Sequence, residues 1–130
     1  MKKKYFLILI ILSVCLSAQP LKIDVRLRLM NDQIISVVVQ INNDSEKTIN
    51  HLEGFINVKD GIGRVLKEER VILIGPSDSP LKDHSTVSRS VKFPIISPVP
   101  DYEFHVSKIT FTGDYRIYTY HPDIGFYRID

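Results

Sequence analysis

The sequence predicts an all-β protein: a single antiparallel immunoglobulin-like β-sandwich of about seven strands that follows an N-terminal signal peptide. Three observations support this fold class. Apolar and polar residues alternate along most segments after residue 20, which is the period of a half-buried strand. Turn-forming residues interrupt these segments at regular intervals, and no segment carries a sustained apolar stripe at helical spacing. Together these features predict stacked sheets.

The first strand is expected over residues 21–29, where alternation is complete. Its apolar face is expected to point into the core and comprises Leu21, Ile23, Val25, Leu27 and Leu29. Further strands are expected over residues 34–41, 49–59, 65–73, 86–93, 102–112 and 115–120, with brief pairing of residues 126–129.

Breaks between the strands have local chemical causes. Asn42-Asn43-Asp44-Ser45 is expected to turn because these side chains bond their own backbone, and Asp60-Gly61-Ile62-Gly63 is a hairpin signal.

Gly54 lies inside a strand, which indicates a bulge or the close approach of another backbone. Pro94, Pro98 and Pro100 forbid a continuous strand. Arg89 falls on an apolar face, which suggests a strand near an edge where it can reach water.

Residues 1–18 have the organisation of a secretory signal peptide. Lys2, Lys3 and Lys4 precede an apolar run that starts at Phe6, and small residues follow up to Ala18. The apolar run is short for a bilayer span, which needs about 20 residues. We therefore expect one folded domain over residues 19–130 and an exported protein, periplasmic or secreted. An uncleaved N-terminal anchor is an alternative.

Cys15 offers a second processing route. Leu12-Ser13-Val14-Cys15 resembles a bacterial lipobox, although Val14 stands where that motif prefers a small residue. Cleavage after Ala18 would release the domain, whereas lipidation of Cys15 would tether it to a membrane. Both routes remain open.

The charge balance argues against a nucleic-acid partner. The chain has 17 Lys and Arg against 15 Asp and Glu, and three of those lysines are in the leader, so the processed domain has 14 against 15. A net charge of −1 leaves nothing to neutralise a phosphate backbone. Cys15 is the single cysteine, so the domain has neither an internal disulfide nor a thiol nucleophile.

Residues 34–94 resemble the immunoglobulin-like extracytoplasmic domains of the FxLYD and LEA14-like kind. The matching pieces are Val39 to Ser45, a strand that ends at Asp60-Gly61-Ile62-Gly63, and the Ser-rich strand Thr86 to Phe93. The loop from Gly75 to Ser85 lacks the usual Pro-Gly turn. The resemblance implies a small sandwich in an envelope-associated or interaction role, and it carries over no catalytic residues.

Several groups of polar residues have the composition of a site and are interpreted as structural. His51 and Glu53 share a strand face and could begin a metal site, and Asp60 could begin a calcium loop. Asp83-His84-Ser85 contains the three residue types of a catalytic triad, but the side chains of neighbouring residues in an extended chain point apart. Asn43-Asp44-Ser45 is formally a glycosylation sequon and is interpreted here as a loop. We expect no cofactor and no metal.

The C-terminal run from Tyr115 to Tyr127 is rich in tyrosine. Alternation places Arg116, Tyr118 and Tyr120 on one face, and Tyr with Arg is enriched at interface hot spots. These rings either shield the edge of the sandwich or bind a partner.

The sequence therefore favours a non-enzymatic module that binds or scaffolds another envelope or secreted protein. The alternative is a small-ligand or carbohydrate-binding module that uses Arg116, Tyr118 and Tyr120. A hydrolase is the least favoured class, because the sequence contains no nucleophile elbow.

Overall fold

The computed structural model describes residues 19–130, and the predicted signal peptide with Cys15 lies outside the described residues. Eight strands make up the described chain, and the predicted all-β fold of two antiparallel sheets is confirmed. The strands are β1 (Leu21–Leu29), β2 (Ile34–Asn43), β3 (Ile49–Lys59), β4 (Val65–Ile74), β5 (Thr86–Pro94), β6 (Asp101–Phe111), β7 (Tyr118–His121) and β8 (Gly125–Arg128).

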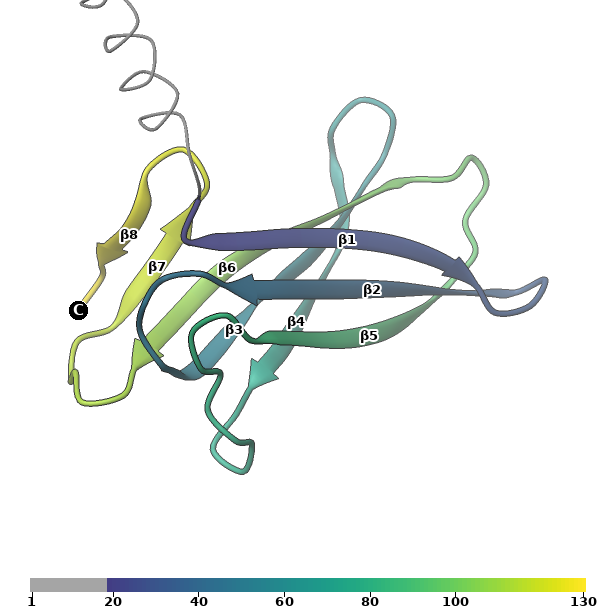
Figure 1. Cartoon of the computed structure of the whole chain (residues 1–130). Coiled ribbons are helices and arrows are strands. Elements are labelled where there is room, and N and C mark those ends of the chain that lie inside the picture. Colours follow the sequence, from purple (N-terminus) through teal and green to yellow (C-terminus); the bar gives the residue numbers. More distant parts are fainter. Residues whose placement is uncertain (1–18) are drawn as a thin grey trace, which may run out of the picture.

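The strands form a three-stranded and a five-stranded sheet (Figure 1). Their orders are β1-β2-β5 and β4-β3-β6-β7-β8. Each named pairing is antiparallel, and β3 and β6 carry the longest ladder of the second sheet. Four strands, β1, β5, β4 and β8, therefore lie at sheet edges. Arg89 is on the edge strand β5, as expected, and pairs there with Asp78, with 3.4 Å between Nη2 and Oδ1.

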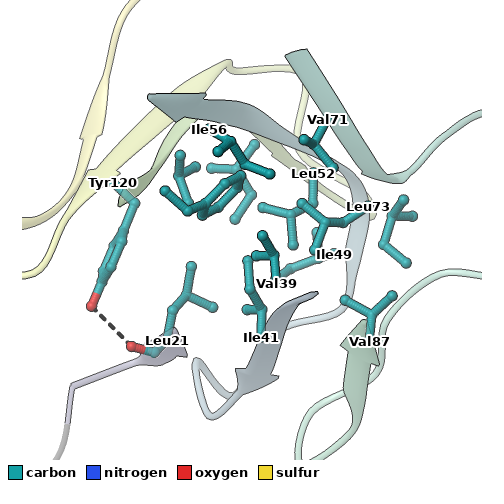
Figure 2. Packing of buried hydrophobic residues seen from close by; sticks show 14 of the residues in the cluster. Leu21, Val39, Ile41, Ile49, Leu52, Ile56, Val71, Leu73, Val87 and Tyr120 are labelled. Carbon is teal, nitrogen blue, oxygen red and sulfur yellow. Dashed lines mark hydrogen bonds between the residues drawn. The ribbon is translucent and has the colours of Figure 1, made fainter. Parts of the chain in front are cut away.

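The core lies between the two sheets and takes side chains from both (Figure 2). Val39, Ile41 and Val87 come from the three-stranded sheet and meet Leu52 and Ile56 from β3. Among the described residues, the completely inaccessible Ile and Leu side chains are Ile41, Ile49, Leu52, Ile56, Leu73 and Ile109. Burying a side chain of this size stabilises the fold by about 1.5–3 kcal/mol.

Gly54 lies at both a bulge and a close approach of another backbone, the two features predicted for a glycine inside a strand. The β3 ladders shift register on either side of Glu53, next to Gly54, which is a bulge. A Cβ at Gly54 would overlap the carbonyl oxygen of His105 and the ring of Phe104. Glycine is therefore required here because β3 and β6 approach closely.

The expected turn at Asn42-Asn43-Asp44-Ser45 is wrong in its start, because Asn42 and Asn43 still pair with β1 and β2 ends at Asn43. Asn43 is a buried connector rather than a simple turn residue. It is fully buried, and its Nδ2 donates to the carbonyl oxygens of Lys47 at 2.8 Å and Leu81 at 3.0 Å. Its Oδ1 accepts from the backbone N–H and the hydroxyl of Ser45. The amide thus satisfies all of its hydrogen-bonding capacity, which a buried polar group needs.

Two further details of the predicted strands are wrong. The last predicted strand starts at Tyr118 instead of residue 115, because Asp114 accepts the N–H of Arg116 at 2.9 Å and holds a turn. On β1, only Leu21, Ile23 and Val25 reach the core, whereas Leu27 and Leu29 are exposed by 47% and 68%. The far end of β1 extends beyond the facing sheet, so alternation alone does not decide burial there.

Candidate interaction surface

The predicted face of Arg116, Tyr118 and Tyr120 divides into two structural tyrosines and one exposed arginine. Tyr120 is only 4% exposed, and its hydroxyl donates to the Leu21 carbonyl at 3.2 Å (Figure 2). Burial raises the pKa of this phenol. The half-buried Tyr118 packs edge-on against Phe111 and donates to Asp114 Oδ2 at 2.8 Å. Arg116 precedes β7 and lies outside the strands. The two rings therefore close the sandwich and offer no free tyrosine face.

The other groups that the sequence singled out form local contacts. Asp60 accepts the backbone N–H groups of Arg64 and Ile62 and the Arg64 Nε, which lowers the pKa of its carboxyl. Both ring nitrogens of His84 face carboxylates, Asp44 at 3.3 Å and Asp83 at 3.1 Å, so neither is directed at a serine. Within residues 19–130 no cluster of three His, Cys, Asp or Glu side chains could hold a metal ion.

Glu53 is a buried acid on the outer face of the larger sheet. Its oxygens accept Arg70 Nε at 2.5 Å and Arg70 Nη2 at 3.0 Å, and His51 Nε2 lies 2.7 Å from Oε1. The hydrogen bonds from Arg70 are the main cause of the low pKa of this carboxyl, which is about 2. Burial raises the pKa, and the hydrogen bond with His51 lowers it by a smaller amount. The carboxylate is thus engaged by an arginine on β4 that the sequence did not pair with it.

An exposed apolar cluster lies at the end of the sandwich away from residue 19. The β1–β2 turn and the β5–β6 connection lie together at this end (Figure 1). We name the cluster the apolar tip and define it as Leu29, Met30, Ile95, Ile96 and Val99. Leu29, Val99 and Met30 are exposed by 68%, 69% and 50%.

Backbone hydrogen bonds fix two members of the apolar tip. Leu29 pairs with Ile35 across the β1–β2 ladder, and the N–H of Ile95 donates to the Gln33 carbonyl at 2.9 Å. Between them runs a groove of about 110 Å³ lined entirely by apolar or aromatic residues, namely Leu29, Ile35, Ile95, Ile96, Val99, Pro100 and Tyr102. The tip is therefore a contiguous apolar surface on an ordered scaffold.

Cations form part of the rim of the apolar tip. Arg28 precedes Leu29 in the chain, and it lies opposite Ser36, which in turn lies opposite Lys92 on β5. An apolar centre with a polar, charged rim is the usual anatomy of a protein–protein interface. Sequence reasoning missed this site because it assigned Leu29 to the core. The signal available was a run of Ile95, Ile96 and Val99 among prolines in a predicted connection.

A second hollow of about 300 Å³ lies beside β7, where the two sheets meet along an open edge. We name it the edge hollow. It is lined by Ile23, Phe104, His105, Val106, Thr119, Tyr120, His121, Pro122, Asp123 and Tyr127. Of the three predicted site residues, Tyr120 is the one that borders it.

The fold and these surfaces define a small β-sandwich with an exposed apolar end. A structure solved as the "Putative ApaA Protein from Bordetella pertussis" has a similar fold, with a TM-score of 0.57 and 15% sequence identity over 87% of this chain and 90% of that one. At this identity the likeness concerns the fold alone. No protein-family model and no curated protein matches the sequence. Among residues 19–130 no helix is long and apolar enough to cross a bilayer.

Proposed function

We propose that this chain is an exported, non-enzymatic, immunoglobulin-like module that binds another envelope or secreted protein through the apolar tip. The observation that carries the proposal is the exposure of Leu29 and Val99 on one apolar groove, with the exposed Met30 next to Leu29 in the chain. Soluble proteins rarely leave large apolar patches in water unless the patch binds something. Complete burial of one such side chain contributes on the order of 1.5–3 kcal/mol, and association itself costs several kcal/mol, so the tip would be the apolar centre of a larger interface.

The strand arrangement supports the immunoglobulin-like part of the proposal. A three-stranded sheet of β1, β2 and β5 packs on a sheet in which β4, β3, β6 and β7 are successive neighbours. Sandwiches of this family are common as extracellular binding modules. Export rests on the leader, and the start of β1 lies at the opposite end of the strand from Leu29. An N-terminal tether at Cys15 would therefore point the apolar tip away from the membrane.

The test is a pair of double variants compared for partner capture. Leu29→Ser with Val99→Ser removes two exposed members of the tip, and Ile62→Ser with Ile124→Ser removes two side chains of similar exposure elsewhere, 78% and 70%. Tagged proteins are cross-linked in the native cell envelope, and the captured proteins are compared by mass spectrometry. We expect the tip variant to lose a partner that the control variant and the unmodified protein retain.

Stability decides how that result is interpreted. Because the substituted side chains are exposed, both variants should melt within a few degrees of the unmodified protein. A partner lost equally from both variants, or a protein that captures the same set with and without its tip, would refute the proposed interface.

A further inference from the structure

The long strand β6 keeps a stretch of free edge beside the edge hollow. It spans 11 residues, whereas its neighbour β7 spans four. The ladder between them contains a single residue pair, Ile109 with Tyr118. Pro122 follows the last residue of β7, and proline has no N–H with which to extend a ladder. On its β7 side, the stretch of β6 from Asp101 to Val106 is therefore without a partner strand among the described residues.

A hydrogen bond shows which residues of β6 direct their main-chain N–H and C=O groups toward β7. The Thr119 hydroxyl donates to the Val106 carbonyl at 3.1 Å, so Val106 directs its main chain toward the β7 side. Residues two apart on a strand direct their N–H and C=O groups to the same side, and Phe104 must do likewise. A side-chain hydroxyl thus supplies one hydrogen bond that a neighbouring strand would otherwise make.

The side chains around this edge separate into an apolar interior and a polar rim. Ile23, Phe104 and Tyr120 line the inner part of the edge hollow, and all three are buried or half-buried. At the rim, His105, Asp123 and Tyr127 are exposed. This pattern suits a strand whose alternate side chains point into the hollow and toward water.

We propose that the free edge of β6 binds an extended peptide segment of a partner protein as an added strand. The segment would pair with Phe104 and with the N–H of Val106, whose carbonyl already accepts the Thr119 hydroxyl, and would place one apolar side chain in the edge hollow. Main-chain hydrogen bonds provide affinity in this binding mode, and side-chain pockets provide selectivity. Asp123 is the carboxylate among the residues that line the edge hollow, so a Lys or Arg beside the apolar residue fits best.

This site is separate from the apolar tip, and either can fail alone. The test is selection of a phage-displayed library of random seven-residue peptides on the purified protein. Enriched peptides are synthesised and titrated against isotope-labelled protein by NMR. We expect alternating apolar and polar sequences whose binding shifts the amide signals of Phe104 and Val106 and slows their hydrogen exchange.

Two further readouts separate strand addition from other binding. N-methylation of the peptide at its pairing residues should weaken binding at least about tenfold, because a main-chain donor is lost. Tyr127→Ala should weaken binding about tenfold, whereas Tyr115→Ala, whose side chain is fully exposed and away from the hollow, should not. Both positions are exposed, so neither variant should unfold the protein.

Five outcomes would overturn the proposal, and the first four are these. The library is not enriched more than on an unrelated β-sandwich, or the peptide binds equally well when N-methylated at any position. Binding is unchanged in Tyr127→Ala, or the amides of Phe104 and Val106 already exchange as slowly in the free protein as the amide of Ile56. Peptides that bind but lose affinity in the Leu29→Ser, Val99→Ser variant would also refute strand addition, while leaving the apolar tip as the interface.

Discussion

Replacing Glu53 by Gln tests whether one buried ion pair on β3 contributes measurably to folding. The Glu53 side chain is 8% exposed and receives two hydrogen bonds from Arg70, which comes from the neighbouring strand. Gln has nearly the same shape but no charge, and its amide nitrogen would face a cation. The substitution therefore removes the electrostatic contribution while leaving the packing almost unchanged.

The size of the effect follows from the pKa of the carboxyl. Its pKa falls from 4.5 to about 2 on folding, and since each pKa unit corresponds to about 1.4 kcal/mol, this is an upper bound of about 3 kcal/mol. Arg70 is 57% exposed, so water screens part of the interaction. We expect Glu53→Gln to lower the free energy of unfolding by about 2 kcal/mol at pH 7.

The pH dependence has a definite sign. Because the pKa is lower in the folded state, the contribution is fully present above pH 4.5, and it disappears as the pH falls through about 2. The difference in unfolding free energy between the unmodified protein and Glu53→Gln should therefore shrink by roughly 1 kcal/mol between pH 7 and pH 3.5.

Urea denaturation followed by circular dichroism at both pH values measures this difference. Glu103→Gln is the matched control: its carboxylate also pairs with a cation, Lys59 Nζ at 2.8 Å, but the side chain is 44% exposed. Exposed pairs contribute below about 1 kcal/mol. Equal losses in the two variants, or a Glu53 effect that does not change with pH, would show that burial and Arg70 do not control this carboxyl.

Five other substitutions, at four positions, have clear expected outcomes. Gly54→Ala should destabilise the protein by at least about 3 kcal/mol in urea denaturation, because its Cβ overlaps the His105 carbonyl; a neutral effect would contradict the close approach. Tyr120→Phe should cost about 1 kcal/mol through the unpaired Leu21 carbonyl, and Tyr120→Ala about 3–5 kcal/mol, whereas an unchanged melting temperature in Tyr120→Ala would remove this ring from the core. Asn43→Ala should cost about 2–3 kcal/mol by the same assay, and an effect near zero would mean that its bonds are replaced by water. Cys15→Ser should leave membrane fractionation unchanged if the leader is cleaved after Ala18, and loss of membrane association would establish lipidation.

The fold could be predicted because the chain signals it locally. Alternation set the bounds of β1. Asp60 ended β3 through hydrogen bonds to the nearby Ile62 and Arg64, and Pro94 ended β5 because proline has no N–H with which to extend a ladder. Gly54 could be flagged because a glycine in a strand needs a reason. Each of these features is fixed within a short stretch, so a single sequence contains them.

The candidate surfaces could not be predicted because they depend on where one sheet ends over the other. Val25 and Leu29 have the same place in the alternating pattern of β1, yet only Val25 is covered by the facing sheet. Arg70 reaches Glu53 through a register that no local pattern specifies. From the sequence, Tyr120 could either shield the edge of the sandwich or bind a partner, and its hydrogen bond to the Leu21 carbonyl assigns it to the interior.

The bonding of Asn43 restricts how the protein can be produced. In a eukaryotic secretory pathway, Asn43-Asp44-Ser45 would be an acceptor for a sugar chain, which attaches to the side-chain nitrogen. That nitrogen uses both of its hydrogens on Lys47 and Leu81 inside the protein. A chain modified during synthesis could not close around this residue, so yeast or mammalian secretion should yield misfolded material, which Asn43→Asp would not rescue because it lacks the donor. Expression in a bacterium avoids the modification.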